Sequence, residues 1–124
     1  MEFSINKQTV ADRFKRSANT YHKEATVQRQ IARHLCELVC PYISQPVSVL
    51  EIGCGTGFLT EEIMKNIPLT SALLNDINPE MKPFIHRFLS EKCRFIACDA
   101  EKQTFGKTFD LLISSSVIQW FNNI

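Results

Sequence analysis

The chain is built around Val49-Leu50-Glu51-Ile52-Gly53-Cys54-Gly55-Thr56-Gly57, the stretch that decides its fold. The first four residues, with Val47 just before them, form an apolar, β-branched run that predicts a buried strand. Three glycines follow at alternate positions, and apolar residues then recur on a helical period from Phe58 to Asn66. A strand, a glycine turn and a helix N-terminus together bring backbone N–H groups close to a polar ligand.

Residue identities exclude two familiar phosphate-binding loops. A P-loop needs Gly-Lys-Ser/Thr, whereas Gly57 is followed by Phe58-Leu59-Thr60. A dinucleotide fingerprint needs its third glycine where Phe58 stands. The pattern that remains is E-x-G-x-G-x-G. Its structural alternative is an ordinary tight strand-to-helix connection.

Length and composition indicate one small globular domain. The 124 residues are 44% hydrophobic and 22% charged, with a net charge of +1, so charge makes no case for a nucleic-acid partner. Residues 1–46 hold seven Lys/Arg against four Asp/Glu, and residues 47–124 hold seven against nine. The basic first segment could face an acidic partner, or form a solvated helix face. We see no signal peptide and no apolar run of the roughly 20 residues that span a bilayer, so we expect no membrane partner.

The five cysteines predict no metal site. Their spacings lack the paired two-residue separation of zinc ligands, and none of the three histidines clusters with them. We expect buried, reduced thiols and therefore a cytoplasmic protein. The cysteines are Cys36, Cys40, Cys54, Cys93 and Cys98.

The first 46 residues predict two helices. Asn6 can cap a helix over residues 7–14, and a second, longer helix follows a break near Tyr21. Its apolar residues recur at the spacing of one helical face, which we expect to be buried: Val27, Ile31, Leu35, Leu38 and Val39. Pro46 marks the boundary with the second segment, residues 47–124.

The second segment alternates strands and helices, which predicts an α/β fold with a parallel sheet. Further strands are expected at 72–74, 94–98 and 109–114. Between the first two, Asn78 as N-cap and Pro79 at the first helical position open a helix. Pro83 predicts an irregular start and regular helix from 83 to 91.

Polar residues follow each predicted strand, at the edge where ligands bind in open α/β sheets. Besides the glycine loop, they are Asp76, Asp99 and the serines 114–116. Asp76 lies about 20 residues past the loop, where a carboxylate can accept hydrogen bonds from both ribose hydroxyls and would repel a phosphate. These features favour a nucleoside ligand. Asp99 alone could equally be a turn cap, and Asp110 is interpreted as a cap because it begins a strand.

The same residues resemble the motifs of class I S-adenosylmethionine-dependent methyltransferases, with a Rossmann-like fold. The resemblance implies that Glu51 to Gly57 surrounds the methionine part and ribose, and that Asp76 holds the ribose hydroxyls. It also implies an adenine flanked by Ile77 and met at its edge by Asp99 and Ala100. Ser114 and Ser115, at the end of the fourth strand, would lie beside the methionine moiety. Tyr21 either closes over that end of the cofactor or merely packs.

The outer segments resemble a narrower family, the malonyl-acyl-carrier-protein O-methyltransferases of biotin synthesis. The N-terminal pattern Lys7-Gln8-x-Val10-x-x-x-Phe14-x-x-x-Ala18-x-x-Tyr21 carries this resemblance, and Gln119-Trp120 adds to it. Trp120 could contact substrate or pack under the sheet. Quinone methyltransferases have similar N-terminal helices. A different small-molecule or quinone acceptor therefore stays open, as does a non-catalytic cofactor-binding module.

This resemblance implies displacement of a sulfonium methyl by the free carboxylate of a malonyl thioester on an acyl carrier. That carboxylate is already ionised at neutral pH, with a pKa of about 4, so no general base is expected and no catalytic residue is assigned. The acidic carrier would suit the basic stretch Arg13, Lys15, Arg16 and Lys23.

The family's sheet has seven strands in the order 3-2-1-4-5-7-6, and this sequence predicts only the first four. The resemblance thus implies a protein about twice as long, truncated here after the fourth strand. Residues 1–46 would cover the cofactor and substrate. Residues 47–124 would form the first half of the cofactor-binding domain. Residues 1–124 by themselves would not be expected to turn over substrate.

Overall fold

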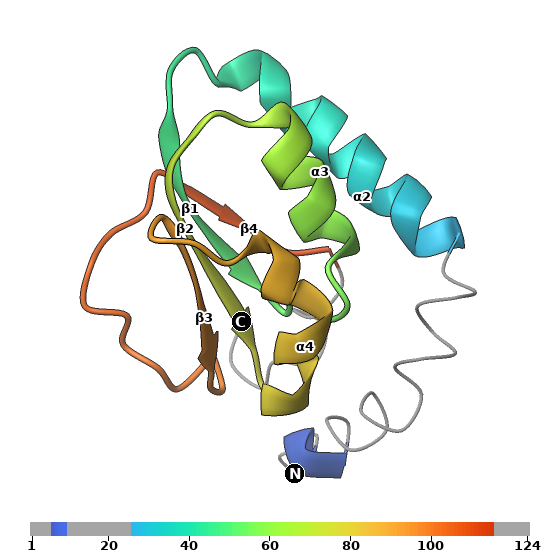
Figure 1. Ribbon diagram of the computed structural model, residues 1–124, viewed down its shortest axis with the longest axis vertical. Coiled ribbons are helices and arrows are strands. Elements are labelled where there is room, and N and C mark those ends of the chain that lie inside the picture. Colours follow the sequence, from blue (N-terminus) through green and yellow to red (C-terminus); the bar gives the residue numbers. More distant parts are fainter. Residues whose placement is uncertain (1–5, 10–25, 116–124) are drawn as a thin grey trace, which may run out of the picture.

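The computed structural model describes residues 6–9 and 26–115. Figure 1 shows their helices packed against a twisted sheet, with the 6–9 turn near the foot of the view. After that first turn come two longer helices, four strands and a broken helical segment. In chain order the elements are α2 Thr26–Val39, η1 Cys40–Tyr42, β1 Val47–Ile52, α3 Phe58–Asn66, β2 Leu69–Asp76, η2 Pro79–Met81, α4 Lys82–Ile85, η3 His86–Phe88, β3 Cys93–Ala97 and β4 Leu111–Ile113.

The four strands form one parallel sheet in the order β3-β2-β1-β4. This confirms the predicted fold class and the first half of the predicted strand order. Leu50 at the centre of β1 pairs with Leu73 on one side and Leu112 on the other. β1 is therefore the central strand of the described sheet, and the glycine loop leaves from its carboxyl end.

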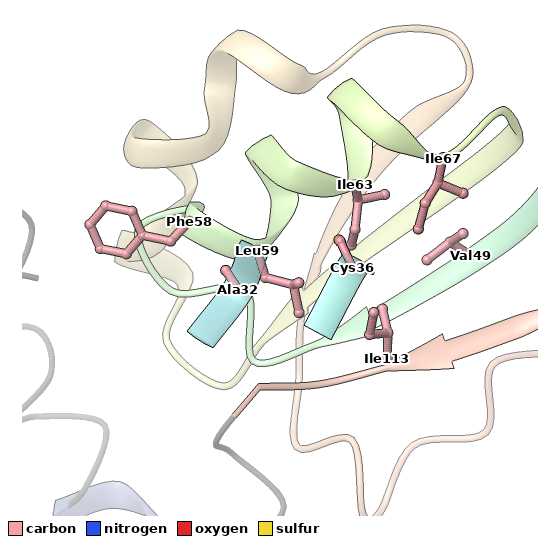
Figure 2. Close-up of a cluster of buried hydrophobic side chains, with 8 residues drawn as sticks. All are labelled: Ala32, Cys36, Val49, Phe58, Leu59, Ile63, Ile67 and Ile113. Carbon is pink, nitrogen blue, oxygen red and sulfur yellow. The ribbon is translucent and has the colours of Figure 1, made fainter. Parts of the chain in front are cut away.

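The main hydrophobic core lies between β1, β4 and the helices α2 and α3 (Figure 2). In that view Cys36 and Ile63 point toward each other from α2 and α3, above Val49 and Ile113. A second cluster joins Ile85 of α4 to Ala72 and Leu74 of β2. Val49 pairs with Ala72 in the sheet, so both clusters lie on one face.

Helix α2 forms where expected, but it buries a different face from the predicted one. Ala32 and Cys36 are each only 1% exposed, whereas Val27, Ile31 and Leu38 are 61%, 48% and 55% exposed. The predicted stripe was therefore wrong for those three residues. Small side chains at the contact let α2 approach α3 closely, and that close packing selects the Ala32–Cys36 face over the more hydrophobic one.

The helix predicted over 83–91 is also wrong, although its irregular start is confirmed. Asn78 caps the segment by accepting the Glu80 N–H at 3.0 Å. α-Helical geometry then lasts only four residues before tightening to a 3-10 turn that ends at Phe88. Pro83 removes one backbone hydrogen-bond donor of the helix. The side chains of Ile85 and Phe88 pack against the backbone at Gly57, and this contact favours the tighter turn.

Two strands differ in length from the prediction. β2 begins three residues early and ends two residues late, because pairing with β1 continues from Leu69 past a bulge at Thr70 to Asn75, one residue before the strand ends. β4 is shorter because Asp110 makes a cap in place of a ladder pair. Its carboxylate accepts the Ser48 N–H at 2.9 Å, and its own N–H bonds to Ser48 Oγ at 3.0 Å. This confirms the structural interpretation of Asp110.

All five cysteines carry free thiols, and three of them are buried, as expected. Burial raises the pKa of the Cys36 thiol to about 12, which keeps it protonated and unreactive. Across residues 6–9 and 26–115, no group of three or more His, Cys, Asp or Glu side chains is placed to hold a metal ion. In the same ranges, no helix has the length and apolarity needed to cross a membrane.

Candidate functional site

The polar residues that follow the strands meet along one edge of the sheet. The Cys54 N–H donates to the Asn75 carbonyl at 2.8 Å, which joins the glycine loop to the end of β2. The Cys98 N–H donates to the Asp76 carbonyl at 3.0 Å, which joins the end of β3 to the same place. Glu51 pairs with Ile113, so Ser114 emerges beside the loop. The glycine loop and the residues that follow β2, β3 and β4 therefore lie along one edge of the sheet, and Ser116 of the predicted serine run lies outside the described residues.

The glycines of the loop serve different purposes. All three have positive φ, at 73° for Gly53, 53° for Gly55 and 96° for Gly57. A Cβ on Gly55 would meet no atom within 4 Å, so that backbone faces open space. A Cβ on Gly57 would lie 3.1 Å from the side chains of both Ile85 and Phe88. Gly55 therefore leaves room for a ligand, and Gly57 leaves room for the protein's own core.

Asp76 braces this loop from the end of β2. Its Oδ2 accepts the Gly55 N–H and its Oδ1 accepts the Asn78 N–H, each at 2.9 Å. Burial raises the pKa of its carboxyl, although these backbone donors oppose the rise by favouring the charged form. The Ile77 N–H also favours the charged form. Three backbone donors thus orient the carboxylate and leave part of its acceptor capacity for a ligand.

Glu51 lies deeper, at the end of β1, and is 1% exposed. Thr60 Oγ1 lies 2.5 Å from its Oε1. The pKa of the Glu51 carboxyl is raised to about 8, chiefly by burial; the Thr60 bond lowers it and the neighbouring Asp76 charge raises it. The Glu51 side chain is therefore protonated at neutral pH, and its bond to Thr60 links β1 to α3.

Asp99 opens a turn after β3, and its Oδ1 accepts the Glu101 N–H at 3.1 Å. This fits the turn-cap interpretation, which does not exclude a ligand role. The side chain of Lys7 contacts Asp99: its Nζ is 3.0 Å from Asp99 Oδ2 and also donates a hydrogen bond to Glu101. Burial would lower the pKa of the Lys7 ammonium, but the bonds to Glu101 and Asp99 outweigh that effect and raise it.

Within residues 6–9 and 26–115, two buried hydroxyls at this edge have no hydrogen-bond partner. They are Thr56 Oγ1 in the glycine loop and Ser114 Oγ after β4. A buried hydroxyl without a partner is unfavourable unless a ligand or water satisfies it. Together with the open space at Gly55 and the acceptor positions on Asp76, they fit a polar ligand such as the expected nucleoside.

The remaining expected site residues divide into two groups. Ile77, Ala100 and Cys54 lie at the same edge as Asp76 and Asp99, and Ser115 follows Ser114 in an exposed position. The other group falls outside the described residues: Tyr21, Gln119, Trp120 and the basic stretch Arg13, Lys15, Arg16 and Lys23.

A separate groove of about 620 Å³ lies at the far end of α3 from the glycine loop. It contains none of the residues that follow the strands, so it is not part of this site. Its lining residues are Arg33, Glu37, Cys40, Pro41, Glu62 and Asn66.

Sequence patterns missed two residues of the site. Asn75 is 2% exposed, and its amide donates to the Cys98 carbonyl at 3.0 Å, fixing the approach to Asp99. The signal that could have identified Asn75 is its polar side chain at the end of an otherwise apolar strand. Lys7 belongs to the N-terminal pattern, but its contact with Asp99 was not predicted, because no local sequence signal indicates a contact between residues 92 positions apart.

Comparison with known proteins agrees with this geometry. A family model described as a methyltransferase domain matches residues 49–124. A relative from Bacteroides thetaiotaomicron is 38% identical over 96% of this chain and 46% of its own length. One from Priestia megaterium is 34% identical over 97% of this chain and 44% of its own. Both are named malonyl-[acyl-carrier protein] O-methyltransferase, and the chain spans about half the length of these relatives.

Solved structures show the same fold. The plantazolicin methyltransferase BpumL, solved in complex with SAH, aligns with a TM-score of 0.65 at 27% identity, covering 90% of this chain and 44% of that one. An S-adenosyl-L-methionine-dependent methyltransferase from Methanococcus maripaludis aligns at 0.71 and 17% identity, over 90% and 53% of the two chains. The chain therefore belongs to the methyltransferase domain family and has the class I S-adenosylmethionine-dependent methyltransferase fold.

Proposed function

We propose that this protein is an S-adenosylmethionine-dependent methyltransferase whose cofactor lies at the carboxyl edge of the sheet. One observation carries the proposal: Asp76 is held against Gly55, with open space beyond the loop, in a chain of the methyltransferase family. When bound, S-adenosylmethionine supplies a methyl group on a positively charged sulfur.

The protein's own groups would bind and orient that cofactor. Asp76 would accept hydrogen bonds from the ribose hydroxyls with the acceptor capacity that its backbone donors leave unused, and Ile77 would lie beside the base. Asp99 and Ala100 would meet the edge of the base. The unpartnered hydroxyls of Thr56 and Ser114 would find their hydrogen bonds at the methionine end. Tyr21 and Ser115 complete the proposed set, with Glu51, Gly53, Cys54 and Gly57 supporting the loop.

The favoured methyl acceptor is the free carboxylate of a malonyl thioester on an acyl carrier protein, a step toward biotin. The names of the two relatives, which match nearly the whole of this chain, support that choice. A carboxylate with a pKa of about 4 is already ionised, so the site needs only to align it and exclude water. We propose residues 1–46 as a cover over this site and 47–124 as half of the binding domain. Five free thiols favour a reducing cytoplasm.

Calorimetric titration with S-adenosylhomocysteine tests the cofactor site. We expect saturable binding by the wild-type protein and loss of detectable binding in Asp76→Ala. The matched control is Asp110→Ala, which removes a carboxylate bonded to Ser48 near the start of β1, at the opposite end of the strands from the site. Equal binding by wild type and Asp76→Ala would contradict the proposed site.

The acceptor is tested with protein expressed from its complete gene and radiolabelled S-adenosylmethionine. We expect label to enter malonyl-carrier protein as an ester that mild base hydrolyses. Acetyl-carrier protein is the control, because it lacks the free carboxylate. Transfer only to a quinone would overturn the proposed acceptor while keeping the enzyme class, and binding without any transfer would favour a non-catalytic module.

A further inference from the structure

Lys7 reaches across 92 residues of sequence to the adenine side of the proposed site. Its Nζ lies 3.2 Å from Asp99 Oδ1 and 3.0 Å from Asp99 Oδ2, and it also bonds to Glu101 Oε1. The three side chains are shielded, with exposed fractions of 12% for Lys7, 19% for Asp99 and 8% for Glu101. Such shielding distinguishes this cluster from an ordinary surface ion pair, whose partners are free to separate.

Both ends of this contact are locally rigid. On one side, Asn6 caps the first helical turn by accepting the Thr9 N–H at 3.1 Å, which fixes the backbone that carries Lys7. On the other side, the Asp99 carbonyl accepts the N–H groups of Lys102 and Gln103 at 3.0 and 3.1 Å. The ion pair therefore joins two preformed turns, so forming it orders side chains more than backbone.

The contact leaves Asp99 able to bind a ligand. An ionised carboxylate has about four acceptor positions. The Glu101 N–H and Lys7 occupy Oδ1, and Lys7 occupies one position of Oδ2. One position on Oδ2 stays available, which suits a single N–H donor such as one hydrogen of the adenine amine.

We propose that Lys7 is a positioning residue for the cofactor: it orients Asp99 toward the adenine amine and ties the N-terminal segment to the occupied site. This inference rests on the proposed function. Because the contact joins the N-terminal turn to a ligand-binding carboxylate, ligand binding and docking of that turn stabilise each other. That coupling is reciprocal by thermodynamic necessity.

The experiment compares two nucleosides in wild type, Lys7→Met and Lys7→Arg. S-Adenosylhomocysteine carries the exocyclic amine from which Asp99 would accept a hydrogen bond. S-Inosylhomocysteine carries a carbonyl oxygen at the same position of the base. A hydrogen bond to a charged group corresponds to roughly 10- to 100-fold in affinity, which sets the upper limit for losing its alignment, so Lys7→Met should weaken S-adenosylhomocysteine binding by about tenfold. Binding of S-inosylhomocysteine should change little, so the preference for adenine should fall. Lys7→Arg should keep most of that preference.

Lys65→Met serves as the matched control, since Lys65 pairs with Glu61 at 3.7 Å on an exposed helix face. It should leave both affinities unchanged. Amide hydrogen exchange gives a second readout: S-adenosylhomocysteine should slow exchange of residues 6–9 in wild type and not in Lys7→Met.

Three outcomes would overturn the inference. Unchanged affinity and preference in Lys7→Met would show that Lys7 plays no part. Equal loss for both nucleosides would indicate a general structural role, and tighter binding would show that Lys7 obstructs the site. If wild type itself binds neither nucleoside, the proposed function fails and the inference with it, whereas normal binding by Lys7→Met overturns the inference alone.

Discussion

Two carboxylates mark the ends of neighbouring strands, and they are held in different ways. Asp76 at the end of β2 is bonded to two backbone N–H groups, from Gly55 and Asn78. Asp99 after β3 is bonded to the Glu101 N–H within its own turn and to the side chain of Lys7, 92 residues earlier. The ribose side of the proposed site is thus fixed by the backbone of the sheet's own loops. The adenine side depends also on a segment that must dock from outside the sheet.

This difference shows how stability and binding can be separated within one site. Backbone donors cannot move away from Asp76 without unfolding the loop, so changes there should cost both stability and affinity. A lysine on an outlying turn can leave Asp99 at little cost to the fold. Changes on that side should therefore alter binding more than stability.

The largest effect is expected for Asp76→Ala. It leaves the Gly55 and Asn78 N–H groups without their acceptor, at roughly 1–3 kcal/mol for each buried donor. Urea denaturation should show the fall in unfolding free energy. A larger fall in unfolding free energy for Asp99→Ala than for Asp76→Ala would contradict the larger structural role of Asp76.

Gly57→Ala should cause the second largest loss of unfolding free energy. A left-handed φ costs roughly 1–2 kcal/mol for a residue with a Cβ, and crowding against Ile85 and Phe88 adds about 1–3 kcal/mol. Gly55→Ala is the matched control, because it carries only the backbone strain. We expect Gly55→Ala to be the more stable variant but to bind S-adenosylhomocysteine poorly, and the reverse order of stability would contradict the assigned roles.

Glu51→Gln should change how stability depends on pH. The folded-state pKa of Glu51 is about 8 against an ordinary value of 4.5, so the folded state keeps a proton that the unfolded state loses between these values. Stability should therefore fall as pH rises from about 4.5 to about 8, by at most about 1.4 kcal/mol per pH unit, and then level off. Thermal unfolding from pH 5 to 9 should show wild type losing stability relative to Glu51→Gln. A constant difference would contradict the raised pKa.

The smallest effect on stability is expected for Asp99→Asn. The amide oxygen can still accept the Glu101 N–H, so only the ion pair with Lys7 is lost. Because that pair is largely shielded, we expect a cost of about 1 kcal/mol, the upper end of the range for exposed pairs. Urea denaturation at low and high salt should show the small difference shrinking as salt screens the pair. A loss as large as that of Asp76→Ala would mean that both strand ends are equally integral to the fold.

Local sequence patterns predicted much of this fold and site. The run from Val49 to Gly57 predicted β1, the loop and the start of α3, because alternating glycines after a β-branched run permit few other structures. The acidic residues at the ends of β2 and β3 were predicted as site residues because the carboxyl ends of parallel strands lie along the same edge of a sheet. Patterns failed at α2, where close packing against α3 chose Ala32 and Cys36 over larger apolar residues, and after Pro83, where contacts with Gly57 tightened the helix.

The sequence by itself determined the order of strands and helices, the glycine loop and the types of residue at each strand end. Backbone conformation and hydrophobic periodicity are local properties, so they can be inferred without knowing what lies across the fold. Only the tertiary structure decided that Asp76 braces Gly55, that Glu51 is buried enough to hold a proton, and that Lys7 lies on Asp99. These depend on distances and burial between segments far apart in the chain, which no local pattern specifies.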